Sequence, residues 1–251
     1  MAGEEPLEII VNGKAYSTTM RTPGDDVELV HGLLHAEGVI KAPSDIIQIR
    51  HRVGDGSASA TGAYNQVIVV LAPEVSFEAP TRATVMNSAC GMCGRTSVDG
   101  LLAPRDDVGG DSPRWSVEVL GQVAASLQEA QRGFKKTGGF HGAALFDRSG
   151  DLLVVREDVG RHNAADKVIG WAMLEGALPA QSEDLGLVIS SRASFELVQK
   201  VTAARMNVMV AVSGPTSMAI EAAREADLTL CAFARPPRMT IYSGEERVDL
   251  G

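Results

Sequence analysis

The sequence predicts an α/β fold, α+β overall, in which a strand-rich N-terminal part precedes an α/β sandwich. Short strand-like runs separated by turn signals fill the first hundred residues. Three strand–helix steps follow one another between residues 187 and 232, and such alternation implies right-handed crossovers and parallel strands covered by helices. Between the two parts, residues 103–114 are rich in proline, glycine and aspartate, which is linker composition. We therefore predict subdomains at residues 1–114 and 115–251.

The N-terminal part begins with a predicted β-hairpin. Asn12-Gly13 separates a run ending in Ile9-Ile10-Val11 from residues 14–20, and Asn-Gly supplies the positive φ angles of a tight turn. Thr22-Pro23 then opens a helix that Gly38 closes. Further strands are predicted over residues 46–53, 67–72 and 81–87, and the last of these leads into a loop with two cysteines.

The C-terminal part opens with a helix after Ser116. Its predicted apolar face comprises Val119, Leu120, Val123, Leu127 and Phe134. Two strands, residues 143–147 and 152–156, flank a turn at Ser149-Gly150, and a helix over residues 163–175 comes next. The three steps that follow pair strands at 187–190, 208–213 and 228–232 with helices at 195–205 and 217–226.

Composition excludes several classes of protein. The net charge of −9 over 251 residues argues against sequence-independent binding to nucleic acid, which depends on Lys and Arg displacing counterions. No apolar run approaches the ~18 residues that a membrane span needs. With three cysteines and no signal-like start, the chain is expected to be cytoplasmic and reduced, without structural disulfides.

Cys90 and Cys93 form a Cys-x-x-Cys pair between small residues. Such a pair can share a proton, relay a sulfur atom, form a strained disulfide or hold half of a metal site. Structural zinc needs four ligands, and Cys231 lies in an apolar strand, where an inert buried thiol is expected. A zinc deaminase pattern is suggested by His35-x-Glu37 together with the pair, but neither motif lies in the strand–helix half. We expect no metal.

An anion-binding edge is predicted where the strands of the second half end. Ligands of open α/β sheets gather at the carboxyl ends of strands. Three such ends are polar here, and they supply Arg192, Ser213 and Thr216, with Arg235 and Arg238 after the last strand. Each residue alone is as readily explained as a helix cap or a solvated side chain.

Two segments that contain glycine are also suited to line a ligand pocket. Gly139 precedes His141 at the start of a strand and permits close backbone approach, and Gly160 precedes His162 at the start of a helix. Either histidine can also be a core or capping residue, and the charged residues 157–167 can be a salt-bridged helix face.

These segments resemble the formate dehydrogenase accessory sulfurtransferases, the FdhD/NarQ family. The resemblance rests on six runs and covers most of residues 22–243: Cys90-Gly91-Met92-Cys93-Gly94, Thr137-Gly138-Gly139-Phe140-His141, residues 156–167, residues 191–196, residues 213–217, and Phe233-Ala234-Arg235. It implies a cytidine-deaminase-like α/β/α sandwich in the C-terminal part and a homodimer.

The resemblance also implies the function. Family members take persulfide sulfur from a cysteine desulfurase and pass it to the molybdenum bis(molybdopterin guanine dinucleotide) cofactor of formate dehydrogenase, the client. Cys90 matches the persulfide carrier, and Cys93 would assist it. A guanine nucleotide-type ligand is expected at the segment Phe233, Ala234, Arg235, Pro236, Pro237 and Arg238, where the family more usually has glycine or asparagine in place of the two prolines. The alternative function is a non-catalytic chaperone that binds and delivers the cofactor.

Overall fold

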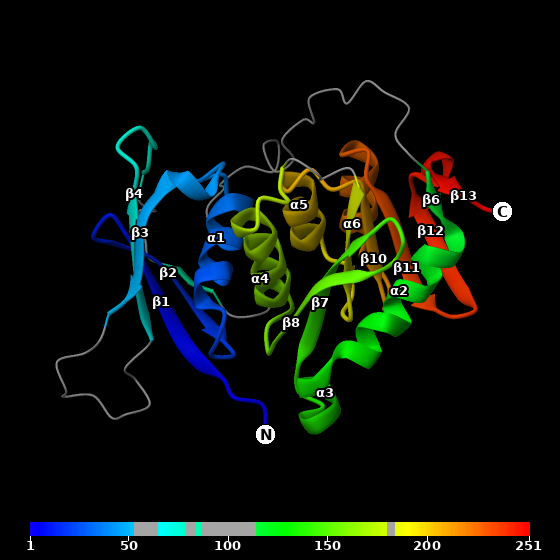
Figure 1. Ribbon diagram of the computed structural model, residues 1–251, viewed down its shortest axis with the longest axis horizontal. Helices are drawn as coiled ribbons and strands as arrows, with labels where there is room; N and C mark the ends of the chain where they lie inside the picture. The colour runs from blue at the N-terminus through cyan, green and yellow to red at the C-terminus, as the bar shows by residue number, and fades with distance from the viewer. Residues whose placement is uncertain (53–64, 79–83, 87–113, 180–183) are drawn as a thin grey trace.

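The computed structural model describes residues 1–52, 65–78, 84–86, 114–179 and 184–251. Two sheets enclose a layer of helices, and a further helix covers the outer face of the second sheet (Figure 1). The predicted combination of a strand-rich N-terminal part with an α/β sandwich is confirmed. Cys90, Cys93 and all but the last residue of the predicted linker lie outside the described residues. The subdomain boundary stays a prediction.

The first sheet confirms the predicted hairpin. It contains β1 (Glu5–Val11), β2 (Lys14–Arg21), β3 (Ile46–His51), β4 (Gln66–Leu71) and β5 (Thr84–Met86), in the order β3-β4-β1-β2-β5. Asn12 and Gly13 have φ angles of 48° and 77°, as a type I′ turn requires. β5 runs parallel to β2 and places Met86 opposite Thr19.

The second sheet contains the parallel strands that the sequence predicts. Its members are β7 (His141–Asp147), β8 (Leu152–Asp158), β9 (Leu185–Ile189), β10 (Val208–Ala211), β11 (Thr229–Arg235) and β12 (Arg238–Ser243), in the order β12-β11-β10-β9-β7-β8. β9, β10 and β11 are parallel, and β7, β8 and β12 are antiparallel to their neighbours. A small parallel pair joins β6 (Trp115–Ser116) to β13 (Val248–Asp249).

One helix differs from its prediction. α2 (Val117–Ala130) ends at Gln131, whose ψ of 86° is not helical, and α3 (Arg132–Thr137) begins anew. Glu157 accepts hydrogen bonds from the backbone N–H groups of Gly133 and Phe134 and so stabilises the start of α3. The assignment of Phe134 to the apolar face of a single helix is therefore wrong: its side chain is 41% exposed.

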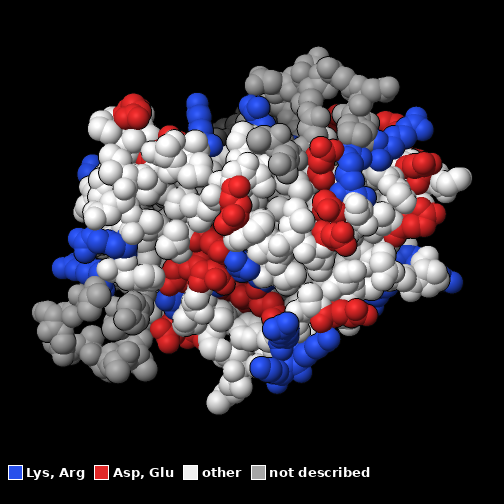
Figure 2. Space-filling model, in the orientation of Figure 1, with Lys and Arg blue, Asp and Glu red and all other residues white. Residues whose placement is uncertain are grey.

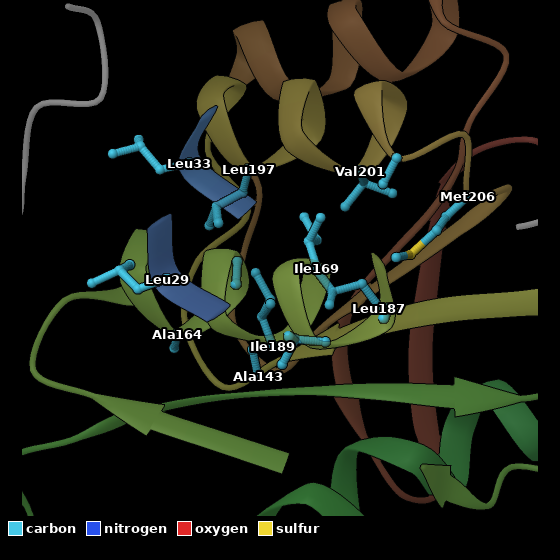
Figure 3. Close-up of a cluster of buried hydrophobic side chains, with 14 of the residues drawn as sticks. Leu29, Leu33, Ala143, Ala164, Ile169, Leu187, Ile189, Leu197, Val201 and Met206 are labelled. Atoms are coloured by element: carbon cyan, nitrogen blue, oxygen red, sulfur yellow. The ribbon is translucent and has the colours of Figure 1, made fainter. Parts of the chain in front are cut away.

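Four helices fill the space between the sheets. They are α1 (Asp26–Ala36), α4 (Arg161–Leu174), α5 (Phe195–Ala203) and α6 (Ser217–Glu225), and their buried side chains belong to one apolar cluster with both sheets (Figures 1 and 3). Short 3-10 helices occupy Pro43–Asp45 and Glu245–Arg247. Side chains of the second sheet alternate: Ala143 and Leu145 of β7 face these helices, while Ala144 and Phe146 face α2.

α1 and α4 cross in backbone contact at two glycines. A Cβ atom on Gly32 would lie 1.9 Å from the carbonyl oxygen of Asp166, and one on Gly170 would lie 1.9 Å from that of Glu28. Neither position can therefore hold a side chain unless the helices move apart. Because α1 belongs to the N-terminal part and α4 to the C-terminal part, this crossing joins the two.

The acidic side chains are unevenly distributed over the surface. On the face in Figure 2, Asp and Glu side chains gather over the middle of the molecule, and basic side chains lie in separate groups. The described residues thus form no continuous basic stripe on this face, such as a nucleic-acid backbone needs. Within the described ranges no helix is both long enough and apolar enough to cross a bilayer.

Candidate functional site

One edge of the second sheet collects every predicted binding segment. β9, β10 and β11 are parallel, so their carboxyl ends lie at the same edge. β7 is antiparallel to β9 and therefore begins there, and β8, antiparallel to β7, ends there. We call this the polar edge; it comprises residues 139–141, 158–162, 190–194, 213–216 and 233–238.

At one end of the polar edge lie His141, Arg161 and His162, which we call the β7–α4 corner. His141 stands opposite Asp158 in the β7–β8 ladder, and Arg161 and His162 form the first turn of α4. The His162 Nε2 atom lies 3.4 Å from the Ser194 hydroxyl and 3.8 Å from the Glu196 carboxylate. The corner thus brings β7, α4 and the start of α5 together.

The histidines of the corner have different electrostatic surroundings. Burial lowers the pKa of His141, and the nearby Arg161 and His162 lower it further, so that its ring is neutral at pH 7. Hydrogen bonding with His162 is the main cause that lowers the pKa of Glu196 to about 2, so that this carboxylate is ionised. The corner therefore pairs a neutral imidazole with an imidazole held against an anion.

The middle of the polar edge consists of two loops bonded to each other. The Thr216 N–H donates to the Ala193 carbonyl at 3.0 Å, and Val212 N–H donates to Ile189 at the same distance. The Thr216 hydroxyl accepts from Ala219 N–H and caps α6, which is the ordinary structural role for that residue. Arg192 is exposed.

At the other end lies the segment that the family resemblance assigns to the guanine dinucleotide. Phe233 has a φ of 51°, is 51% exposed, and packs its ring over Gly214, where a Cβ atom would come within 2.7 Å of that ring. Its N–H donates to Ser213. Pro236 and Pro237 form the turn between β11 and β12, with exposed Arg235 and Arg238 opposite each other.

Ala234 differs from its neighbours in this segment. Its side chain is 1% exposed and belongs to the apolar cluster beneath α2, so its methyl group serves the core. Gly139 is exposed at the opposite end of the polar edge, beside Ala2. The structure thus brings the predicted binding residues to one edge but spreads them along its whole length.

The arginines of the polar edge differ from the arginines that are paired with carboxylates elsewhere in the structure. Arg21, Arg156 and Arg247 each contact a carboxylate at 2.6–2.9 Å. Among the described residues, by contrast, Arg161, Arg192, Arg235 and Arg238 have no carboxylate partner, a state they share with exposed arginines elsewhere such as Arg50 and Arg132. The Arg161 Nε atom is buried and has no hydrogen-bond acceptor among those residues. Guanidinium groups held in this way suit phosphate or other anionic groups of a ligand.

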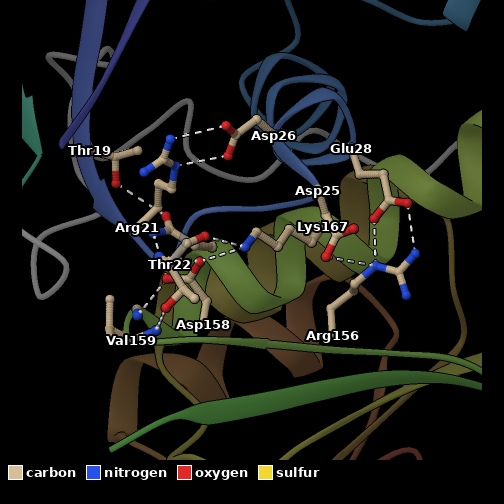
Figure 4. A network of polar contacts seen from close by, with 12 residues as sticks. Thr19, Arg21, Thr22, Asp25, Asp26, Glu28, Arg156, Asp158, Val159 and Lys167 are labelled. Atoms are coloured by element: carbon tan, nitrogen blue, oxygen red, sulfur yellow. Dashed lines mark hydrogen bonds and ion pairs between the residues drawn. The ribbon is translucent and has the colours of Figure 1, made fainter. Parts of the chain in front are cut away.

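A buried polar cluster supports the corner from behind. The Asp158 carboxylate contacts Lys167 at 2.8 Å, and both side chains are at most 1% exposed. Thr22 joins them through three hydrogen bonds: its N–H donates to Asp158, its carbonyl accepts from Lys167, and its hydroxyl accepts from Val159 N–H (Figure 4). We call this group the Thr22 clamp. It fixes the end of β2 to the β8–α4 junction.

The Thr22 clamp gives a structural role to the charged residues 157–167. Asp158 and Lys167 form a buried ion pair, not a solvated helix face, and Glu157 caps α3. Sequence reasoning missed Thr22, whose partners lie more than 130 residues away. It also gave no role to Glu196. An acidic residue in the first turn of α5, soon after Arg192, is a pattern that could have indicated a polar contact at this end of the helix.

The residues of the apparent zinc deaminase pattern have protein partners. The two ring nitrogens of His35 lie 3.3 and 3.1 Å from the carbonyl oxygens of Ile40 and Ala203. Glu37 accepts a hydrogen bond from the Tyr16 hydroxyl. Both side chains thus connect α1 to neighbouring elements.

Glu37 makes a pH effect on stability predictable. Burial raises its pKa from 4.5 to about 7, so between these values the folded chain binds a proton that the unfolded chain does not. The free energy of unfolding should therefore fall by roughly 3 kcal/mol as pH rises from about 4.5 to above 7. Glu37→Gln should remove this fall, as measured by urea unfolding at several pH values. The exposed control Glu225→Gln should keep it, and an unchanged slope in Glu37→Gln would contradict the assignment.

Comparisons with known proteins agree on one family. A family model described as FdhD/NarQ family matches residues 2–249. A protein of Nocardia farcinica called "Sulfur carrier protein FdhD" is 43% identical over 249 residues, which cover 99% of this chain and 88% of that protein. The protein of that name from Mycobacterium tuberculosis is 43% identical over 253 residues, covering 99% and 91%.

A solved structure has the same fold. It is a putative formate dehydrogenase accessory protein from Desulfotalea psychrophila, with 22% identity, a TM-score of 0.73, and coverage of 98% of this chain and 90% of that one. A guanine deaminase from Nitrosomonas europaea is more distant, with 16% identity, a TM-score of 0.39 and coverage of 45% and 76%.

Proposed function

The chain belongs to the FdhD/NarQ family, and on that premise we propose that it is a sulfur carrier serving formate dehydrogenase. Cys90 takes persulfide sulfur from a cysteine desulfurase, and the acceptor is the molybdenum bis(molybdopterin guanine dinucleotide) cofactor. The single observation that carries the choice of ligand is the polar edge, with four arginines that have no carboxylate partner in the described part of the chain. An exposed aromatic ring at Phe233 adds a surface on which a base can stack.

The chemistry requires two displacement steps. In the first, the Cys90 thiolate attacks the outer sulfur of the desulfurase persulfide, an S–S bond forms on Cys90, and the desulfurase thiolate leaves with the electron pair. In the second, the Cys93 thiolate attacks the inner sulfur, a Cys90–Cys93 disulfide forms, and the outer sulfur leaves as hydrosulfide. Hydrosulfide then replaces an oxygen ligand of the acceptor, which is released as water. A cellular dithiol reduces the disulfide.

The proposal includes a cellular location and an oligomeric state. Thiolates must be regenerated between turnovers, so we place the protein in the reducing cytoplasm. By analogy with the family we expect a homodimer.

Persulfide loading tests the carrier role directly. After incubation with a cysteine desulfurase, cysteine and pyridoxal phosphate, the intact protein should gain about 32 Da, the mass of one sulfur. Cys90→Ala should abolish the adduct. Cys231→Ala is the matched control and should load normally, because Cys231 is fully buried and its burial raises the pKa of its thiol to about 12. A wild-type protein that gains no sulfur, or a Cys90→Ala variant that still does, would refute the proposal.

A non-catalytic cofactor chaperone is the second candidate. The residues of the polar edge favour this candidate, because those that the structure describes can bind an anionic nucleotide without a thiol. Under this alternative the wild-type protein binds GDP in calorimetry but acquires no adduct, whereas a carrier does both.

A further inference from the structure

We propose that α3 is a docking surface for an acidic patch on the enzyme that receives the cofactor, with Phe134 inserted into an apolar pocket of that enzyme. The surface consists of Arg132, Phe134, Lys135 and Lys136, which we call the α3 patch. This inference rests on the proposed function, and it adds the surface through which the carrier meets its client, formate dehydrogenase.

The α3 patch concentrates positive charge in a chain that is acidic overall. Arg132, Lys135 and Lys136 are exposed, and among the described residues none of them forms an ion pair. The Lys135 Nζ atom donates to the Glu129 carbonyl at 2.9 Å, which leaves its charge unpaired. No acidic residue occurs in the sequence between Glu129 and Asp147, although the whole chain has a net charge of −9. In Figure 2 a basic group lies where Figure 1 shows α3. The patch therefore attracts a negatively charged partner.

The helix that carries the patch is fixed at both ends. At its start, the Glu157 carboxylate accepts from the N–H groups of Gly133 and Phe134 at 2.6 and 2.7 Å. At its end, Gly138 has a φ of 68° and donates its N–H to the Phe134 carbonyl at 2.7 Å. The Phe140 ring packs under Gly133, where a Cβ atom would come within 2.7 Å of it. A partner therefore meets a preorganised surface and loses little free energy in ordering it.

Phe134 indicates which kind of anionic partner fits. Its side chain is 41% exposed, and its backbone bonds to Glu157 and Gly138 hold it in this position. One exposed aromatic ring is ordinary by itself, but a ring among three unpaired cations has the composition of a protein interface. Binding to anionic lipid or to a nucleic-acid backbone depends on larger basic clusters than this one. The chemistry therefore favours an acidic protein surface with an apolar pocket at its centre.

The position of α3 indicates which protein this is. The helix ends at Thr137, and three residues later the chain enters β7 at His141, on the polar edge. Glu157, which holds the start of α3, directly precedes Asp158 at the end of β8. A protein seated on the α3 patch therefore borders the polar edge. Under the proposed function that edge binds the cofactor, so the partner best served by this position is the enzyme that takes the cofactor up.

Binding to cofactor-free formate dehydrogenase, measured by calorimetry, tests the surface. The double variant Arg132→Gln/Lys136→Gln and the single variant Phe134→Ala should each raise Kd about tenfold or more, because each removes central contacts. The matched control Lys14→Gln/Lys41→Gln removes two charges from exposed positions outside α3 and should change Kd by less than about twofold. Equal effects of the two double variants, no effect of Phe134→Ala, or no binding by the wild-type protein would each overturn the proposal.

Further measurements keep the docking surface separate from the carrier function. The α3 patch variants should retain the GDP affinity, the persulfide adduct and the melting temperature of the wild-type protein, because the exchanged side chains are exposed and lie outside the polar edge.

Three results would assign the α3 patch to something else and overturn the proposal. They are a loss of GDP affinity in the patch variants, a change in the sedimentation of these variants alone, which would indicate a contact between copies of this chain, and patch-dependent binding to phosphatidylglycerol vesicles. A wild-type protein that gains no sulfur would instead refute the carrier function, and the Kd comparison would still decide the docking surface.

Discussion

Replacing Gly170 by alanine should destabilise the protein by about 3 kcal/mol or more, one of the largest effects of any single methyl group in this chain. The new Cβ would lie 1.9 Å from the Glu28 carbonyl oxygen, and backbone atoms of α1 cannot move aside as a side chain tip can. The crossing of α1 and α4 would have to open, which also loosens the apolar contacts around Leu29 and Ile169 (Figure 3). Urea unfolding followed by circular dichroism measures the change.

Gly121 of α2 provides the matched control. It is also helical, but a Cβ atom there would meet no atom within 4 Å. Gly121→Ala should therefore stabilise the protein by about 0.5–1 kcal/mol, because alanine loses less entropy than glycine in a helix. If both variants shifted stability alike, the close approach of α1 and α4 would not exist as described.

Replacing Lys167 by methionine should cost about 3–5 kcal/mol. The change keeps the length of the side chain but leaves the fully buried Asp158 carboxylate without its cation, and Thr22 loses the donor to its carbonyl. The loss should appear as a lower midpoint of urea unfolding at pH 7. Adding Asp158→Asn to Lys167→Met should restore part of the stability, because the unpaired charge is then gone.

The exposed pair Arg148–Asp184 provides the comparison. Its atoms are as close, at 2.6 Å, but the Asp184 side chain is 64% exposed. Asp184→Asn should therefore change stability by less than about 1 kcal/mol. A Lys167→Met protein as stable as Asp184→Asn would mean that Asp158 is not held in the interior by charge pairing.

Local signals predicted most of the fold. The Asn12-Gly13 turn, the closing Gly38 with its φ of 74°, and the strand–helix steps of the second half each depend on residues close in sequence. β12 was missed because Pro236-Pro237 reads as a loop, although the two prolines occupy only the turn before an antiparallel strand. Phe134 was misplaced because the new helix depends on Glu157, 23 residues away.

The candidate site was predictable in its segments but not in its arrangement. Topology alone brings His141 and Phe233 to one edge, because β7 runs opposite to β9 and β11. Nothing near Thr22 in sequence indicates that it bonds to Asp158 and Lys167. Such contacts depend on how two sheets pack across shared helices, and a periodic pattern contains no information about that.

The helical layer enclosed by both sheets has a consequence for partial unfolding. If the first sheet detached, it would bare the faces of α1 and α4 that now pack against Leu7, Ile9 and Val69, so local opening there would expose much of the central core. Backbone amides of β1 should consequently exchange with solvent only when the whole molecule unfolds. A nick or truncation within the first strands would then destabilise the polar edge of the second sheet as much as the first sheet itself.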